Sequence, residues 1–286
     1  MNVVLIYNAK SGGKYDVRRL KKLFKEHGVK VTYSFSVQQL SSQKLASLIR
    51  RGVTVAVVGG DGTQNAAARL IVGTKSSLFP LPGGTFNHFV RDLGQPSTVE
   101  EALANISTLK TRMIDVAYVN DELFLNNSNL GFYPFSLIEQ KKTKKLIGKL
   151  PAAAISGLLQ FMRFKRHSLV IDGKQIRSPF VFVGNNVFDI NDGMIPARRA
   201  FARGVLTVMI AVSPSRLRLL RSALGVLRGN VSNHEDFILS HRKQLAIYST
   251  HESIPVSYDG ELKRLAPPLE YRIKPKALRV ATVKKS

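Results

Sequence analysis

The chain has 286 residues, of which 44% are hydrophobic, and it carries a formal net charge of +24 with no cysteine. This composition supplies enough apolar material for one large or two compact domains and excludes a disordered chain. The lack of cysteine excludes disulfides and thiolate metal sites. The basic excess favours partners that carry negative charge, such as nucleotides, anionic lipids or nucleic acid.

The sequence contains no pattern for crossing a membrane. Its first residues lack both a basic n-region and a long apolar run. The longest largely apolar stretch, residues 151–162, is about a dozen residues long, whereas a bilayer span needs ~20. We therefore expect a cytoplasmic protein that meets membranes only peripherally.

The N-terminal third alternates strand and helix patterns. Short apolar runs predict strands at residues 2–7, 29–35, 54–58 and 77–81. Apolar residues at helical spacing predict helices at residues 15–27, 40–51, 63–72, 86–92 and 98–106. This alternation predicts a Rossmann-like parallel sheet with helices on both faces.

The pattern changes near residue 112, where tight turns join short strands. Asn120-Asp121 and Asp172-Gly173 each separate two apolar runs, which is typical of hairpins. Further strands are expected at residues 180–184, 206–212, 244–249, 254–258 and 269–274. We therefore predict an α/β domain at 1–115 and an antiparallel, β-rich domain at 116–286.

Two basic segments interrupt the β-rich half, at residues 139–167 and 215–228. Their Lys and Arg side chains are interleaved with apolar ones, as in helices that lie on membrane surfaces. Equally, their apolar sides could pack on the sheet while the charges face water.

The most specific pattern is Gly59-Gly60-Asp61-Gly62-Thr63, which lies between an expected strand and an expected helix. Glycines let the backbone turn sharply and approach a ligand closely. The N-terminus of the following helix offers N–H groups and the positive end of a dipole to a phosphate. Asp61 would repel a phosphate, which favours Mg²⁺, water or a ribose as its contact. An ordinary tight connection is the alternative.

Two more glycine-containing loops follow expected strands. One begins Pro82-Gly83-Gly84-Thr85-Phe86-Asn87, and the other is Asn8-Ala9-Lys10-Ser11-Gly12-Gly13-Lys14. The second lacks the G-x-x-x-x-G-K spacing and is therefore not a P-loop. Because the carboxyl ends of parallel strands lie side by side, we expect the three loops to converge on one ligand.

A further pattern is Tyr258-Asp259-Gly260-Glu261, with two carboxylates at the end of an expected strand. One carboxylate could accept a hydroxyl proton while the other orients the nucleophile, as phosphoryl transfer to an alcohol requires. An ordinary Asp-Gly turn remains the alternative. His88 and His234 are expected to be structural or surface residues.

Together these motifs resemble the diacylglycerol kinase catalytic-domain family, which includes bacterial lipid kinases and sphingosine kinases. They are N-x-x-S-G from Asn8, G-G-D-G-T from Gly59, P-x-G-T-x-N-x-F from Pro82 and D-G-E from Asp259. They occur in the family's order and extend over nearly the whole chain. The resemblance implies a nucleotide-binding α/β domain, a C-terminal β-sandwich-like domain and a cleft between them.

The resemblance also implies roles for single residues. Glu261 would accept the proton of the acceptor hydroxyl, and Asp259 would support it. The nucleotide would contact Asn8, Ala9, Lys10, Ser11, Gly12, Ser36, Gly59, Gly60, Asp61, Gly62, Thr63, Gln64, Asn65, Gly84, Thr85 and Asn87. The implied cofactors are ATP and the Mg²⁺ that accompanies it. Residues 124–133 look like the segment that opens the family's second domain.

Two departures from the family pattern bear on function. His88 stands where the family's P-L-G-T-G-N-D has an acid. The family's D-D-G-x-x-D stretch, which binds a structural Mg²⁺, corresponds here to residues 202–207, which contain no acid. We therefore expect that separate Mg²⁺ site to be absent, and we hypothesise that Arg203 replaces the charge of the cation.

The sequence thus predicts an ATP-dependent kinase for a hydroxyl of diacylglycerol or a related lipid at an anionic membrane surface. One alternative is NAD kinase, which shares the G-G-D-G-T loop. Another is a catalytically silent basic protein of the same fold that binds lipid or nucleic acid. The G-T-x-N-x-F and D-G-E motifs favour the lipid kinase, and lipid is favoured over nucleic acid as a partner. The identity of the lipid and the oligomeric state stay open.

Overall fold

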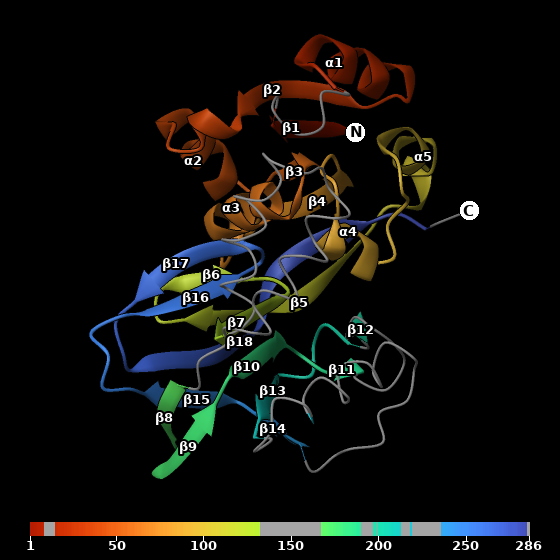
Figure 1. Ribbon diagram of the computed structural model, residues 1–286. Coiled ribbons are helices and arrows are strands. Elements are labelled where there is room, and N and C mark those ends of the chain that lie inside the picture. The colour runs from red at the N-terminus through yellow and green to blue at the C-terminus, as the bar shows by residue number, and fades with distance from the viewer. Residues whose placement is uncertain are drawn as a thin grey trace, which may run out of the picture. The chain divides into compact units, whose positions relative to one another are not determined.

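A computed structural model describes residues 1–8, 15–131, 167–189, 197–198, 200–212, 218 and 236–284. The chain forms two compact units, one of Met1–Val116 with Pro275–Ser286 and the other of Ala117–Lys274 (Figure 1). The chain therefore returns to the first unit at Pro275. The ranges 1–115 and 116–286 drawn from the sequence do not include that return.

The first unit is built on a parallel sheet with strand order β2-β1-β3-β4, as the sequence predicts. The last strand of the chain adds to it beside β4, where Val280 pairs with Leu78 in parallel. The strands are β1 (Asn2–Tyr7), β2 (Lys30–Ser36), β3 (Thr54–Gly59), β4 (Ser77–Pro82) and β18 (Leu269–Thr282).

Helices cover both faces of this sheet (Figure 1). They are α1 (Val17–Glu26), α2 (Gln43–Arg50), α3 (Asp61–Ile71), α4 (His88–Asp92) and α5 (Val99–Ala104), with 3-10 turns at Val37–Gln39 and Ile106–Thr108. Leu20 and Phe24 of α1 share a core with Leu103 of α5 and with Leu5 and Phe79 of the sheet. The spacing of Leu20 and Phe24 by one helical turn is what gives α1 its buried stripe.

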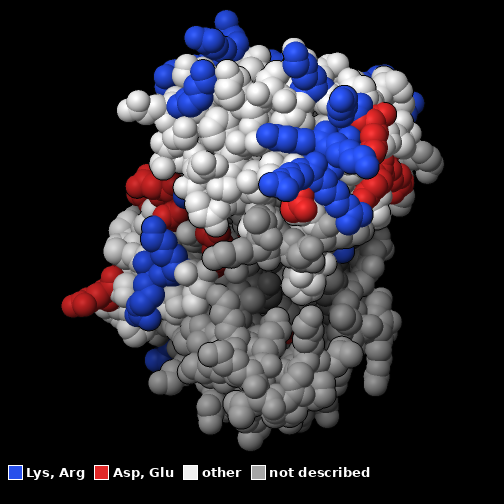
Figure 2. Space-filling model, turned by 90° about the horizontal axis from the view of Figure 1, so that it is seen from above, with Lys and Arg blue, Asp and Glu red and all other residues white. Residues whose placement is uncertain are grey.

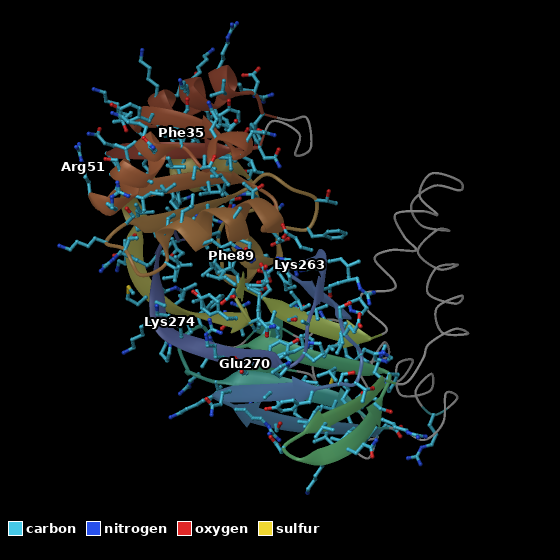
Figure 3. All side chains as sticks on the ribbon, turned by 90° about the vertical axis from the view of Figure 1, so that its left-hand side faces the viewer. Phe35, Arg51, Phe89, Lys263, Glu270 and Lys274 are labelled. Atoms are coloured by element: carbon cyan, nitrogen blue, oxygen red, sulfur yellow. The ribbon has the colours of Figure 1, made fainter. Side chains whose placement is uncertain are left out.

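The buried and exposed faces of the first unit are separated as its amphipathic patterns predict. Phe89 of α4 is fully buried inside the unit, whereas Arg51, the residue that follows α2, points outward (Figure 3). The helix expected at 40–51 starts only at Gln43, after a turn at Leu40 and Ser41 that the Ser42 N–H closes by donating to the Gln39 carbonyl.

The second unit is an antiparallel β-sandwich. One sheet has the order β14-β13-β10-β7-β16-β17, and the other includes β15, β8 and β9 with the first half of β18. The strands are β5 (Lys110–Val119), which begins in the first unit, β6 (Glu122–Phe124), β7 (Asn127–Gly131), β8 (His167–Ile171), β9 (Lys174–Ser178), β10 (Phe180–Asn185), β11 (Phe188–Asp189), β12 (Ala197–Arg198), β13 (Leu206–Ala211), β14 (Phe237–Arg242), β15 (Gln244–Tyr248), β16 (Ile254–Tyr258) and β17 (Glu261–Leu265).

The sandwich core follows from the two-residue period of its strands. Val181 and Val183 of β10 and Val256 of β16 meet Leu245 and Tyr271 of the facing sheet in one apolar cluster. Burial raises the pKa of the Tyr271 phenol, which lies inside this cluster. The fold class predicted from the sequence, an α/β domain followed by an antiparallel sandwich, is therefore confirmed.

Candidate active site

The turn between β3 and α3 contains Gly59–Thr63, and the helix begins at Asp61 with Gly60 as its N-cap. A side chain at Gly59 would bring a Cβ within 2.5 Å of the Cβ of Thr63, so only glycine fits there. The first turn of a helix leaves N–H groups without partners inside the helix, and its dipole is positive at that end. The turn can therefore accept an anionic group.

The loop after β4 packs its backbone directly against this turn. A Cβ at Gly84 would approach Gly60 Cα to 2.4 Å, and one at Gly83 would approach the Gly59 nitrogen to 2.7 Å. The Gly83 N–H also donates to the Gly59 carbonyl at 3.1 Å. The predicted convergence of these two glycine loops is confirmed by these contacts.

Side chains of the two loops fix this arrangement. Asp61 accepts hydrogen bonds from the N–H groups of Phe89 at 2.9 Å and His88 at 3.2 Å, and so caps the start of α4. Asn87, with a left-handed φ of 50°, bonds through its amide to both the N–H and the carbonyl of Gly84 at 2.9 Å. The Asp61 carboxylate thus joins the loops, a role that its sequence context did not indicate.

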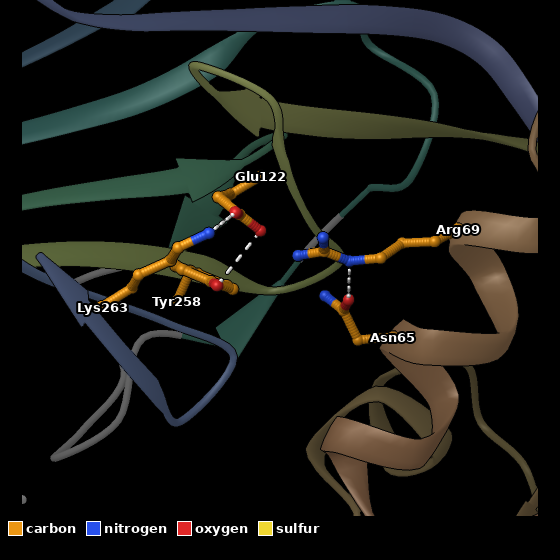
Figure 4. Close-up of polar contacts among 5 residues, drawn as sticks. All are labelled: Asn65, Arg69, Glu122, Tyr258 and Lys263. Carbon is orange, nitrogen blue, oxygen red and sulfur yellow. Dashed lines mark hydrogen bonds and ion pairs between the residues drawn. The ribbon is translucent and has the colours of Figure 1, made fainter. Parts of the chain in front are cut away.

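Two polar residues of α3 that the resemblance assigned to the nucleotide form hydrogen bonds within the protein. Gln64, which is fully buried, donates from Nε2 to the carbonyls of Val57 and Leu81 at 3.0 Å each. Asn65 accepts a bond from Arg69 Nε at 2.9 Å (Figure 4). Gln64 therefore fastens α3 to β3 and β4.

Of the remaining positions assigned to the nucleotide, the described ones lie at the same edge of the sheet. Asn8 follows β1 and donates to the Thr63 hydroxyl at 3.4 Å. Ser36 ends β2 and pairs with Tyr7 of β1. Thr85 is exposed at the surface of the β4 loop. The residues Ala9, Lys10, Ser11 and Gly12 lie outside the described part of the chain.

In the second unit, Asp259 and Gly260 form the two-residue turn between β16 and β17, with φ angles of 46° and 81°. The Asp259 carboxylate accepts the N–H groups of Leu125, Asn126 and Asn127 at 2.6, 2.7 and 3.3 Å. Glu261 is exposed and pairs with Tyr258 across the hairpin. The two carboxylates therefore have different surroundings: that of Asp259 is bound to backbone, and that of Glu261 faces solvent.

A second acidic residue lies on the same side of this hairpin as Glu261. Glu122 forms an ion pair with Lys263 and accepts a hydrogen bond of 3.1 Å from the Tyr258 hydroxyl (Figure 4). Tyr258 pairs with Glu261, and Lys263 follows two residues later on the same face of β17. Sequence reasoning missed Glu122, because its 141-residue separation from Lys263 leaves no spacing signal.

The hypothesis that Arg203 replaces a bound cation is not supported, because its side chain is exposed. Its backbone N–H donates to Asn186 Oδ1 at 2.7 Å. The buried arginine nearby is Arg198, which donates to the Leu125 carbonyl at 2.6 Å and lies over the rings of Phe188 and Phe201. The turn at Leu125 is thus held on both sides: Arg198 donates to its carbonyl, and Asp259 accepts from its N–H.

Within the described ranges, no three or more His, Asp or Glu side chains gather where they could hold a metal ion. No described helix has both the length and the apolar character required to span a bilayer. Most of the basic segments 139–167 and 215–228 fall outside the residues that the structure describes, so their predicted membrane contact stays a prediction.

Comparison with known families agrees with both units. The model of the diacylglycerol kinase catalytic domain matches residues 2–119, and that of the YegS C-terminal NAD kinase beta sandwich-like domain matches residues 138–282. This chain belongs to the diacylglycerol kinase catalytic-domain family. The resemblance inferred from the sequence motifs is thereby confirmed.

Individual members of this family show how far the similarity extends. A Staphylococcus epidermidis protein named "Putative lipid kinase" is 27% identical over 79% of this chain and 75% of its own length. A "Probable lipid kinase YegS-like" of Yersinia enterocolitica is 31% identical over 60% of each chain. The crystal structure of a "putative diacylglycerol kinase" from Bacillus anthracis superposes with a TM-score of 0.73 at 22% identity, over 98% of this chain and 96% of that one. At that identity the match shows the fold.

Proposed function

We propose that this member of the diacylglycerol kinase family transfers the γ-phosphoryl group of ATP to a hydroxyl of diacylglycerol or a related membrane lipid. The observation that carries the proposal is the backbone contact of Gly59–Gly60 with Gly83–Gly84 at the N-terminus of α3. Two pairs of glycines, which leave the backbone uncovered at a helix N-terminus, suit a polyphosphate better than a neutral ligand. Lipid kinase names among the relatives support the choice of acceptor.

In this proposal the loops hold the triphosphate through backbone N–H groups. Asp61 is the one acid within Gly59–Asn65, and both of its oxygens accept N–H groups of α4. Mg²⁺ would therefore be held chiefly by phosphate oxygens, with any share from Asp61 added to its capping role. The ion would neutralise charge that develops between the β- and γ-phosphates.

Glu261 is proposed as the base. As the acceptor oxygen forms its bond to the γ-phosphorus, its proton passes to the Glu261 carboxylate, and the bond to the β-phosphate oxygen breaks to release ADP. Asp259 is assigned a positioning role, because its carboxylate already accepts three backbone N–H groups. It keeps the Leu125 turn and the Glu261 hairpin in register.

The acceptor would be reached at a membrane surface, which the protein would approach from the cytoplasm as a peripheral protein. Its net charge of +24 attracts anionic headgroups. Helix α1 presents Arg18, Arg19, Lys21, Lys22 and Lys25 as exposed residues. Figure 2, seen from above Figure 1, shows Lys and Arg side chains gathered over this helix.

The test is the transfer of label from γ-labelled ATP to lipid in vesicles that contain diacylglycerol. Wild type should produce a labelled lipid. Glu261→Gln should lower transfer by at least about 100-fold while ATP affinity is kept, because only proton removal is lost. Glu270→Gln removes an exposed carboxylate from β18 of the same unit and serves as the matched control.

Each contrary outcome has a distinct meaning. Vesicle binding without transfer by wild type would indicate a catalytically silent lipid-binding protein, and label on NAD would indicate an NAD kinase. Full transfer by Glu261→Gln would remove Glu261 from the mechanism.

Asp259→Asn should lower both thermal stability and transfer, because its amide group would face the backbone N–H groups from which the carboxylate now accepts hydrogen bonds.

A further inference from the structure

Phe86 is an exposed aromatic residue in the middle of the loop between β4 and α4. Its side chain is 68% exposed, more than any other large hydrophobic side chain among the described residues. It lies two positions after Gly84, whose backbone touches Gly60. Two residues span at most about 7 Å, so the ring stands close to the proposed phosphate site.

The ring belongs to an ordered stack. The imidazole of His88 lies parallel to it, with centroids 5.6 Å apart and an interplanar angle of 15°. Arg91 Nη2 lies 2.7 Å from His88 Nδ1. An arginine can only donate, so Nδ1 accepts and the ring is held in a defined orientation. One face of Phe86 thus rests on His88, while its exposure leaves the other open.

The backbone under the stack is also fixed. Asn87 closes the loop on Gly84 with two hydrogen bonds, and Asp61 holds the N–H groups of His88 and Phe89 with two more. An exposed phenylalanine on a loop tied at four points loses little conformational freedom when a ligand binds. The arrangement is that of a preformed, flat binding surface.

We propose that the Phe86–His88 stack binds the base of the nucleotide whose phosphates occupy the glycine loops. This inference rests on the proposed function and adds a base-binding residue to it. A base is joined to its phosphates through a single ribose, so it must bind near the phosphate loops. The β4 loop adjoins the β3 loop directly in the sheet order, which places the stack within such a reach.

A planar base explains the geometry of the stack better than an acyl chain does. Parallel rings extend one π-surface, and a base adds to it by stacking without any hydrogen-bond code. An acyl chain would need only an apolar surface of any shape, and a parallel imidazole adds nothing to that. The positive charge of Arg91 does not favour a nucleotide over a lipid, because it is compatible with both ligands.

The experiment measures the binding of Mg-ATP and of magnesium tripolyphosphate, which has no base, to the full chain by calorimetry. Phe86→Ala should weaken ATP binding by between about 5-fold and 150-fold, the range expected for one stacked base. Tripolyphosphate binding should stay within about twofold of wild type, because the loops are untouched. Phe86→Tyr should restore ATP affinity. Tyr33→Ala removes a 42% exposed ring from β2 and is the matched control.

The variants also distinguish the rival explanations. If Phe86→Leu binds ATP with the affinity of wild type, an apolar side chain of any shape is sufficient at this position. Stacking is then not required, and the inference is wrong. It is equally wrong if Phe86→Ala keeps its ATP affinity but loses binding to phosphatidylglycerol vesicles, which would make Phe86 a membrane contact. If wild type binds neither ATP nor tripolyphosphate, the proposed function itself fails and the inference falls with it.

Discussion

At the scale of single residues, many polar side chains of the motifs are used to build the protein. Asp61 caps α4, Asn87 closes its own loop, and Gln64 bonds to the carbonyls of two strands. Asp259 holds three N–H groups of a turn. The surface that these bonds hold in place is largely backbone, which suits a site that binds phosphate through N–H groups.

The bond from Asp61 to α4 leads to the first prediction at this scale. Asp61→Ala removes two hydrogen bonds and should lower the free energy of unfolding by about 1–2 kcal/mol. It should also weaken ATP binding at least about tenfold, because the β4 loop is released from the β3 turn. Thermal melts and calorimetric titration with Mg-ATP measure the two effects.

Asp16→Ala is the control for that prediction. Asp16 caps α1 by accepting the Arg19 N–H at 2.7 Å, and its loss should cost about 1 kcal/mol of stability. Among the described residues its side-chain bond is to α1 and not to the β3 turn or the β4 loop, so the ATP affinity of the variant should match that of wild type. Equal ATP affinity in both variants would show that the Asp61 cap does not organise the site.

Single-residue roles are also where sequence reasoning reaches least far. The glycine loops were found because their residues are contiguous and follow strands. The Glu122–Lys263 pair and the two contacts of Arg198 with the Leu125 turn depend on tertiary folding. A sequence shows that residues are acidic or basic, but not which of them meet when distant strands come together.

At the scale of elements, regular strands and helices were predicted well, and their ends were not. Buried apolar runs such as β1 and β3 carry a strong period-two or continuous signal. β17, with the sequence ELKRL, was missed because it is mostly polar and lies at the edge of its sheet. β18 was expected to end at 274, but it continues to Thr282 and pairs with β4 in the same sheet in which its first half pairs with β15.

Contacts between elements give a prediction about pH. The Tyr15 hydroxyl, just before α1, donates to Glu100 Oε2 of α5 at 2.6 Å. Burial, followed by this hydrogen bond to a carboxylate, raises the pKa of Tyr15 from 10.0 to about 12. The folded state therefore keeps this proton more tightly than the unfolded state. The stabilisation is complete below pH 10 and is lost as the pH rises from 10 to about 12.

Urea titrations across that pH range test the contact. Wild type should lose stability with rising pH more steeply than Tyr15→Phe, because the variant has no proton at this site to release. At neutral pH the variant should be less stable by about 1 kcal/mol, for the lost hydrogen bond. Tyr248→Phe, which removes an exposed phenol, is the control. Parallel pH curves for wild type and Tyr15→Phe would refute the contact.

At the scale of the whole molecule, composition predicted the attraction to anions but not where it acts. A net charge of +24 is a sum over 286 residues, and it does not reveal any face. The structure places five exposed Lys and Arg residues on the single helix α1. The acidic residues of this helix and its N-cap are Glu26 and Asp16 respectively. One of the basic residues, Lys22, lies 3.9 Å from Glu26, a surface pair that contributes little.

If α1 contacts the membrane, binding to phosphatidylglycerol vesicles should depend on that helix. Changing Lys21, Lys22 and Lys25 together to glutamine should weaken binding by up to roughly 150-fold, since each basic residue near the surface contributes about 1 kcal/mol. The matched control changes three scattered exposed lysines, Lys110, Lys174 and Lys243, to glutamine. It removes the same charge but should weaken binding far less, because the potential of the surface falls off within a Debye length of about 10 Å at 0.1 M salt. Vesicle co-sedimentation at low and high salt measures both, and equal losses in the two triple variants would mean that net charge, not α1, determines membrane binding.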